Sequence, residues 1–140
     1  MVEVYDLAQA AHSQLANIST RGFVDIDNNV MIGGLIVGGG AANVIVLALG
    51  PSIPVDGALA DPTLELHDVN GVTIATNDNW KINDQTGQSQ QAEIEATTVP
   101  PTNDLESALV QTLAPGNYTA IVRGKNNTTG VGLVAAYNLQ

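Results

Sequence analysis

The sequence predicts an all-β fold, a jelly-roll-like β-sandwich whose strands are mostly antiparallel. Short segments that alternate apolar and polar residues recur along the 140 residues, and turns rich in Gly, Pro and Asn separate them. This spacing is typical of sandwiches rather than of helical or α/β folds. The core is expected to be aliphatic, because the chain has only one Trp, one Phe and three Tyr. We expect residues 8–140 to form a single domain.

The predicted elements follow from the same pattern. The strands are expected at residues 16–26, 30–37, 44–49, 63–67, 72–76, 104–113, 118–123 and 131–139. The first is expected to break at Gly22, and the second and third to be a buried pair joined by the glycine turn 38–40. The clearest hairpin surrounds the turn Asp68-Val69-Asn70-Gly71.

Two further segments are less regular. The polar stretch 77–91 predicts a loop. Residues 104–113 have the composition of either a helix or a strand. The turn Pro115-Gly116 and the alternating residues after it favour a hairpin, and therefore a strand, for residues 104–113.

Composition excludes several classes of function. The net charge is −10, with 14 acidic and four basic residues, so binding to nucleic acid or to an anionic membrane is not expected. The chain has no cysteine, which excludes thiolate metal sites and disulfides. Residues 28–55 carry no charge, but their glycines and β-branched residues fit two strands better than a membrane helix. Acidity favours solubility outside cells, so we expect an extracellular or cell-surface location.

A hexapeptide is duplicated at the two ends of the chain. Residues 2–7 and residues 134–139 share Val, Tyr and Leu in the same places, and Tyr5 lies 132 residues before Tyr137. Residues 1–7 are therefore either the last strand of a preceding tandem unit or a strand lent to a neighbouring subunit. The residues expected to make this contact are Val2, Val4, Tyr5, Leu7, Val134, Tyr137 and Leu139. Val2, Val4 and Leu7 would fill pockets of an acceptor near residues 131–139, with Tyr5 on the opposite face.

Motifs spread over nearly the whole chain carry a resemblance. They are found at residues 15–23, 30–34, 48–52, 58–66, 77–80, 101–108 and 118–126. Together they resemble an uncharacterised module of large secreted bacterial proteins. The resemblance implies tandem repetition, and it implies no catalytic residue.

The second half of the chain carries a more distant resemblance. Residues 61–138 contain a strand, an Asp-x-Asn-Gly turn, a second strand, an Asn-Asp loop and the string Pro115-Gly116-Asn117-Tyr118-Thr119. This order is similar to the bacterial pre-peptidase C-terminal domain, which implies a secreted jelly-roll accessory module.

Calcium is the cofactor to consider first, because it prefers carboxylate and carbonyl oxygens from loops. The candidate ligands are Asp25, Asp27, Asp78 and Asp104, and the loops of Asp78 and Asp104 are the most suitable pair. The simpler alternative is that these side chains cap turns through local hydrogen bonds.

A glycan is the other candidate ligand. Trp80 lies in a polar loop beside Asn77 and Asn79 and could stack on a sugar. The favoured alternative is that Trp80 covers one end of the core. The serines and the two histidines form no nucleophile motif, so an enzyme is not expected.

These observations favour a non-enzymatic, extracellular structural subunit or repeat. It would associate head to tail with copies of itself through terminal strand addition and form a filament or surface array. The alternative is a monomeric module that binds carbohydrates or cell-surface glycans and accompanies a secreted protein.

Overall fold

The structure, a computed structural model, describes residues 17–139. This part of the chain forms eight strands, one α-helix and a short 3₁₀ turn. In chain order these are β1 (Asn17–Val24), β2 (Met31–Val37), β3 (Ala42–Leu49), β4 (Pro62–His67), β5 (Thr73–Asn77), α1 (Gln91–Ala96), β6 (Ser107–Leu113), β7 (Gly116–Gly124), η2 (Lys125–Asn127) and β8 (Gly130–Asn138).

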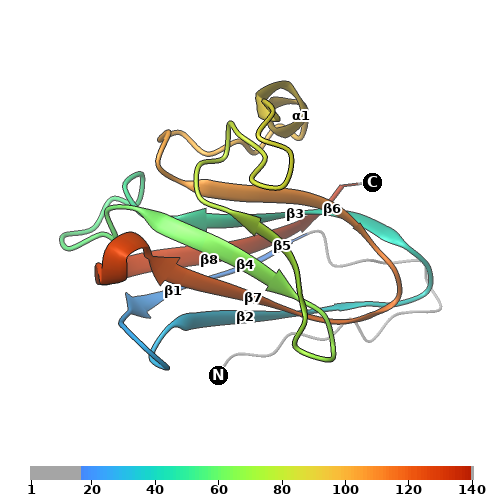
Figure 1. Ribbon diagram of the computed structural model, residues 1–140, viewed down its shortest axis with the longest axis horizontal. Coiled ribbons are helices and arrows are strands. Elements are labelled where there is room, and N and C mark those ends of the chain that lie inside the picture. Colours follow the sequence, from blue (N-terminus) through green and yellow to red (C-terminus); the bar gives the residue numbers. More distant parts are fainter. Residues whose placement is uncertain (1–16, 140) are drawn as a thin grey trace.

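The strands form two sheets that pack face to face (Figure 1). One sheet, sheet A, has the order β1-β8-β3-β6, and the other, sheet B, has the order β2-β7-β4-β5. Every pair of neighbouring strands is antiparallel. The predicted all-β sandwich is therefore confirmed. No helix in residues 17–139 has both the length and the apolar character needed to span a bilayer.

Most connections in the described chain cross from one sheet to the other, as in a jelly roll. The predicted hairpin is confirmed, because β4 pairs with β5. Two other predictions were wrong. β2 and β3 lie in different sheets, as do β6 and β7, so neither glycine-containing turn closes a hairpin. The break expected at Gly22 was also wrong, since β1 pairs with β8 through that residue without interruption.

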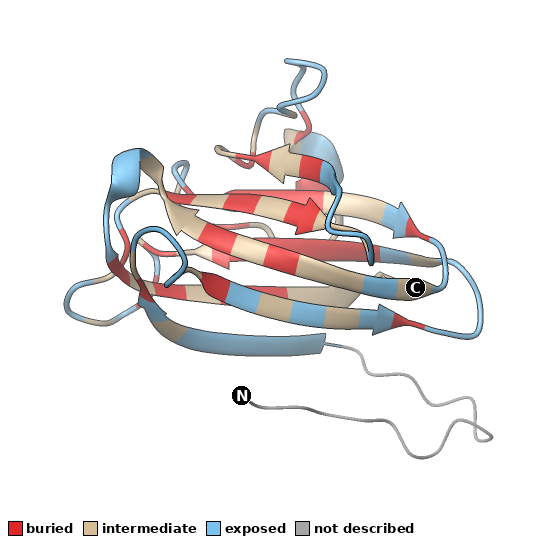
Figure 2. Cartoon of the chain, turned by 60° about the horizontal axis from the view of Figure 1, so that its bottom comes forward, coloured by how far each residue is buried: buried red, intermediate tan, exposed pale blue. Residues whose placement is uncertain are grey.

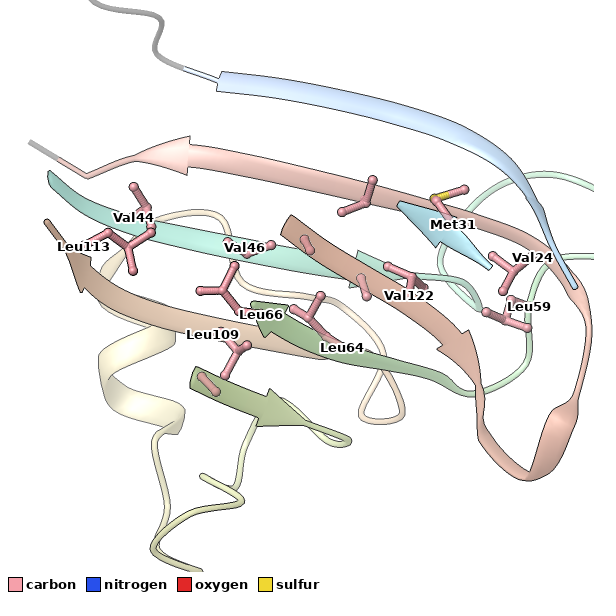
Figure 3. Packing of buried hydrophobic residues seen from close by; sticks show 14 of the residues in the cluster. Val24, Met31, Val44, Val46, Leu59, Leu64, Leu66, Leu109, Leu113 and Val122 are labelled. Atoms are coloured by element: carbon pink, nitrogen blue, oxygen red, sulfur yellow. The ribbon is translucent and has the colours of Figure 1, made fainter. Parts of the chain in front are cut away.

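An aliphatic core fills the space between the sheets (Figure 3). β4 shows how the sequence builds it, because Pro62, Leu64 and Leu66 alternate with half-buried residues and point inward. Leu64 and Leu66 are almost completely buried, as are Val122 from the neighbouring strand β7 and Val46 from β3 in the facing sheet. The prediction of an aliphatic rather than aromatic core agrees with this packing.

A second apolar group, here called the outer cluster, lies on the outer face of sheet A. Its buried members are Ile45, Leu47, Trp80, Ile94, Ala108 and Ala135. α1 covers this face with a single buried side chain, Ile94. β3 is consequently buried on both faces, which explains its continuous apolar run.

Candidate functional site

Four of the described strands lie at sheet edges, β1 and β6 in sheet A and β2 and β5 in sheet B, and β1 and β2 lie on one side of the sandwich. Among the described strands, β1 pairs only with β8 and β2 pairs only with β7. The two strands contact each other across the sandwich. An edge strand presents unpaired backbone N–H and C=O groups, so this side is a template for another strand.

β1 is unusually exposed for a strand of a sandwich. Six of its eight residues are exposed, and these include Ile18 and Phe23. Figure 2 shows β1 as a nearly continuous exposed ribbon at the rim of the sandwich. Only Val24, at its end, is buried in the core. β1 is therefore held mainly by its ladder with β8.

β8 does not provide the free edge that the sequence analysis expected near residues 131–139. β8 pairs with β1 on one side and with β3 on the other, so the expected acceptor position was wrong. Val134 is buried in the core, whereas Tyr137 and Leu139 pack against the outer cluster. The donor residues Val2, Val4, Tyr5 and Leu7 lie outside the described residues.

The packing of β8 shows which face each residue of the C-terminal hexapeptide takes. Leu139 and Tyr137 both pack on the outer cluster, while Val134 and Ala136 face the core. By the same two-residue alternation, a strand with the sequence of residues 2–7 presents Leu7 on the face of Tyr5. Only Val2 and Val4 then match core-facing positions of β8.

The acidic loops are held by lysines. Asp78 Oδ2 lies 2.6 Å from Lys125 Nζ, and Asp104 Oδ1 lies 2.6 Å from Lys81 Nζ. The loops of Asp78 and Asp104 meet, since the Ser107 hydroxyl lies within hydrogen-bond distance of the Asp78 carbonyl. The two carboxylates nevertheless have different lysine partners. Within residues 17–139, no group of three acidic, His or Cys side chains is arranged to hold a metal ion.

The ammonium group of Lys125 forms ion pairs with the carboxylates of Asp78 and Asp61. It also interacts electrostatically with Asp84. Burial raises the pKa of Asp61 above its ordinary value, while Lys125 lowers it. Burial also raises the pKa of Asp84. The pKa of Lys125 is raised, first by its hydrogen bond to Asp78. One oxygen each of Asp61 and Asp78 is buried without a hydrogen-bond partner in the described chain.

The other two candidate ligands for calcium shape a turn. The Asp25 carboxylate accepts a hydrogen bond from the N–H of Ile26, 2.8 Å away. Asp27 has a positive φ of 55°, and its carbonyl accepts a hydrogen bond from Arg123. Local capping accounts for the Asp25 carboxylate, and Asp27 shapes the turn through its backbone.

Trp80 belongs to the core rather than to an open surface. Its side chain is only 4% exposed, and its indole N–H donates to the Asn103 carbonyl at 3.1 Å. Asn77 is also buried. Its amide donates to the carbonyls of Asn79 and Ile82 and accepts the N–H of Ala108. The ring therefore offers no exposed face on which a sugar could stack, as the favoured alternative expected.

Glu106 is a buried carboxyl that the sequence analysis did not single out. It is fully buried, and one oxygen accepts from the N–H groups of Gly50 and Ser52 at 3.0 Å and from the Ser52 hydroxyl at 2.5 Å. The other oxygen accepts the N–H of Asn103. The two carboxylate oxygens of Glu106 therefore connect the loop after β3 to the loop before β6. No signal in the local sequence separates it from an exposed Glu.

A groove lies beside the end of β8. It has a volume of about 420 Å³ and is lined by Asn43, Glu93, Ala96, Thr97, Val110, Asn138 and Leu139. It is open and contains one acidic side chain but no nucleophile and base in contact. His67 lies on sheet B and bonds Glu65, away from any serine hydroxyl in the described hydrogen bonds.

Comparison with known proteins supports the fold. No known family matches the sequence. No curated protein matches it either. A similar solved structure is the pre-peptidase C-terminal domain of collagenase from Bacillus anthracis. It has 14% sequence identity and a TM-score of 0.53, and the match covers 86% of this chain and 89% of that one. The distant resemblance of residues 61–138 to this class of domain therefore agrees with the structure at the level of fold.

Proposed function

We propose that this chain is a non-catalytic, extracellular structural module that joins copies of itself head to tail. Residues 2–7 of one copy would add to the free edge of β1 in the next. The observation that carries the proposal is the exposure of β1, which has one paired and one unpaired edge among the described strands.

The known partner of β1 explains why residues 2–7 suit its other edge. β1 already pairs with the sequence of residues 134–137, with Thr20 opposite Val134 and Ile18 opposite Ala136. Residues 2–7 nearly repeat residues 134–139. An added strand in the same register would place Val2 and Val4 on the side of Ile18 and Thr20. These valines would cover the exposed apolar surface of Ile18.

Such a contact is not self-complementary, because the donor and the acceptor are different surfaces of the chain. Repetition therefore produces an open chain of subunits unless the rotation between successive copies closes a ring. In a covalent tandem array the same strand would be the end of the preceding unit. Both forms place successive modules in a row.

The test compares the intact chain with a truncated chain and two point variants by light scattering and negative-stain microscopy. The intact chain should form long oligomers, while a chain without residues 1–8 and a Val4→Asp chain should not. Glu3→Gln is the matched control, because Glu3 lies on the opposite face of the donor strand. A monomeric intact chain at every concentration would refute strand addition and leave only the tandem interpretation.

The rival function, a monomeric glycan-binding accessory module, has less support. The likeness to the collagenase domain fits an accessory module, but Trp80 is buried and offers no stacking platform. The rival therefore gains support only if the intact chain is monomeric. A glycan array with the intact chain would then be the next measurement.

A further inference from the structure

Within residues 17–139, β2 is an edge strand without the usual protection against pairing. Its sequence, Met31–Val37, contains no charged residue and no proline. It pairs with β7 over all seven residues without a bulge. Natural proteins normally shield such an edge with lysine, proline, a bulge or a covering loop. Ile32 and Ile36 are 58% and 74% exposed on its outer face.

The strand is also close to a palindrome about Gly34. In an antiparallel pair of two β2 strands centred on Gly34, Ile32 of each copy lies opposite Ile36 of the other. Gly33 lies opposite Leu35, and Met31 lies opposite Val37. Each cross-strand pair is therefore apolar, and the bulky Leu35 meets a residue without a side chain.

We propose that β2 pairs with β2 of a second copy around a twofold axis at Gly34. The two copies of sheet B then form one continuous eight-stranded sheet. The occupant of this edge is a second copy because the strand is complementary to itself. The inference goes beyond the head-to-tail contact, which uses β1 and residues 2–7.

Charge also favours this arrangement, although each chain carries a net charge of −10. The turn before β2 contains Asp25 and Asp27, whereas the turn after β2, residues 38–40, is all glycine. In the antiparallel pair, the acidic turn of one copy lies beside the glycine turn of the other. The two acidic turns are then separated by the length of the strand, more than about 20 Å. At that distance physiological salt screens most of the repulsion between their charges.

One strand per copy makes a small interface. Stable interfaces involve about 20–30 residues from each partner, whereas this contact has the seven residues of β2 from each copy. We therefore expect a reversible dimer whose population depends on concentration. β1 and β2 lie on the same side of the sandwich, so the twofold contact and strand addition at β1 should compete.

A single engineered cysteine tests the register, because the native chain has no cysteine. In the proposed dimer the Cα atoms of the two Gly34 residues are about 5 Å apart, which a disulfide can bridge. A side chain at Gly34 meets nothing within 4 Å. The Gly34→Cys chain should therefore form a covalent dimer under mild oxidation.

Two matched cysteines provide the controls. In the same pair, two Ile36 residues lie about 13 Å apart along the strand and cannot be bridged. Ile74→Cys places an exposed cysteine on β5, the opposite edge of sheet B. Both should give only background cross-linking. Equal yields from Gly34→Cys and Ile74→Cys would overturn the proposal.

Sedimentation equilibrium provides a second test that needs no disulfide. In the full-length chain with Val4→Asp, which disables the donor strand, a monomer–dimer equilibrium should remain. Adding Ile36→Lys should raise the dimer Kd by at least about tenfold, while Ile74→Lys should leave it unchanged. A Val4→Asp chain that is monomeric throughout, or a dimer insensitive to Ile36→Lys, would refute the twofold contact without bearing on strand addition.

Discussion

Removal of the buried Glu106 carboxyl should destabilise the protein more than any other loss of one acidic group in the described chain. Glu106→Ala leaves three backbone N–H groups and the Ser52 hydroxyl without their acceptor. Each unsatisfied donor costs about 1–3 kcal/mol when buried. The site of Gly50 is buried and the others are partly buried. Water can reach some of the partly buried donors and reduce their cost. We therefore expect Glu106→Ala to lower the free energy of unfolding by at least about 4 kcal/mol.

Glu106→Gln separates the hydrogen bonds from the side-chain volume. Its carbonyl oxygen can still accept from Gly50 and Ser52, but its NH₂ group would face the N–H of Asn103. We expect an intermediate loss of about 2 kcal/mol, since neutral acceptors bind about half as strongly as charged ones. Relief of the buried charge offsets part of this loss.

The assay is urea unfolding followed by circular dichroism and by Trp80 fluorescence. Trp80 reports on this region because its backbone N–H donates a hydrogen bond to the backbone carbonyl of Glu106. Glu93→Gln, on the exposed face of α1, is the matched control and should change stability by less than about 0.5 kcal/mol. If Glu106→Ala and Glu93→Gln unfold at the same urea concentration, the bonding role assigned to Glu106 is wrong.

Three further predictions concern other parts of the sandwich. Gly50→Ala should lower the free energy of unfolding by about 3 kcal/mol, because its Cβ would lie 2.0 Å from the Leu59 carbonyl oxygen; an unchanged melting temperature would contradict this. Two hydrogen bonds of the His67 ring raise its pKa above the ordinary value of 6.5. The bond to the Gly71 carbonyl has the larger effect, and the bond to Glu65 comes second. The resulting stabilisation is complete below the unfolded-state pKa and is lost as the pH rises through the folded-state pKa, so His67→Gln should cost more stability near pH 5.5 than near pH 8.5. Equal costs at both pH values would refute that assignment. Millimolar calcium should leave the melting temperature unchanged, because Asp78 and Asp104 already pair with different lysines and no group of three acidic, His or Cys side chains within residues 17–139 is arranged to hold a metal ion. A rise of several degrees would contradict this and support a calcium site.

The hairpin of β4 and β5 shows what local sequence can specify. Its turn, Asp68–Gly71, has an Asp side chain that accepts the N–H groups of Asn70 and Val72, and Gly71 adopts a positive φ of 77°. These interactions lie within five residues of one another. The pattern of the two strands and the turn between them is therefore sufficient to predict both the elements and their pairing.

Turns of similar composition gave a wrong prediction for β2 and β3. The glycine turn between them permits a hairpin, but it permits a crossing between sheets equally well. Met31 and Val37 are buried in the same core as Val44 and Val46, from the facing side. Which strands become neighbours depends on how the apolar faces of all eight strands are covered together.

α1 was missed for a related reason. It has six residues, and only Ile94 is buried, so it has no helical period of apolar residues to recognise. Its position is fixed by contacts from distant parts of the chain. The Gln90 amide, for example, donates to the carbonyls of Trp80 and Ala108.

The candidate site divides in the same way. The duplicated hexapeptide is visible in the sequence, and it predicts that residues 2–7 form a strand like the end of β8. The sequence predicted the acceptor near residues 131–139, but the tertiary structure pairs β8 on both sides and leaves β1 and β2 among the edge strands. It also decides that Trp80 is covered and that Glu106 is buried.

Alternation, turn residues, charge and repetition can be read over a few residues at a time, so the order of amino acids was enough to predict an acidic all-β sandwich and to show a hexapeptide repeated at its ends. The order of strands in a sheet, the free edges and the burial of single polar groups arise from pairings between residues far apart in the chain. Many such pairings satisfy the same local pattern. Only the packing of the whole core selects one of them, and with it the two edges from which association is proposed here.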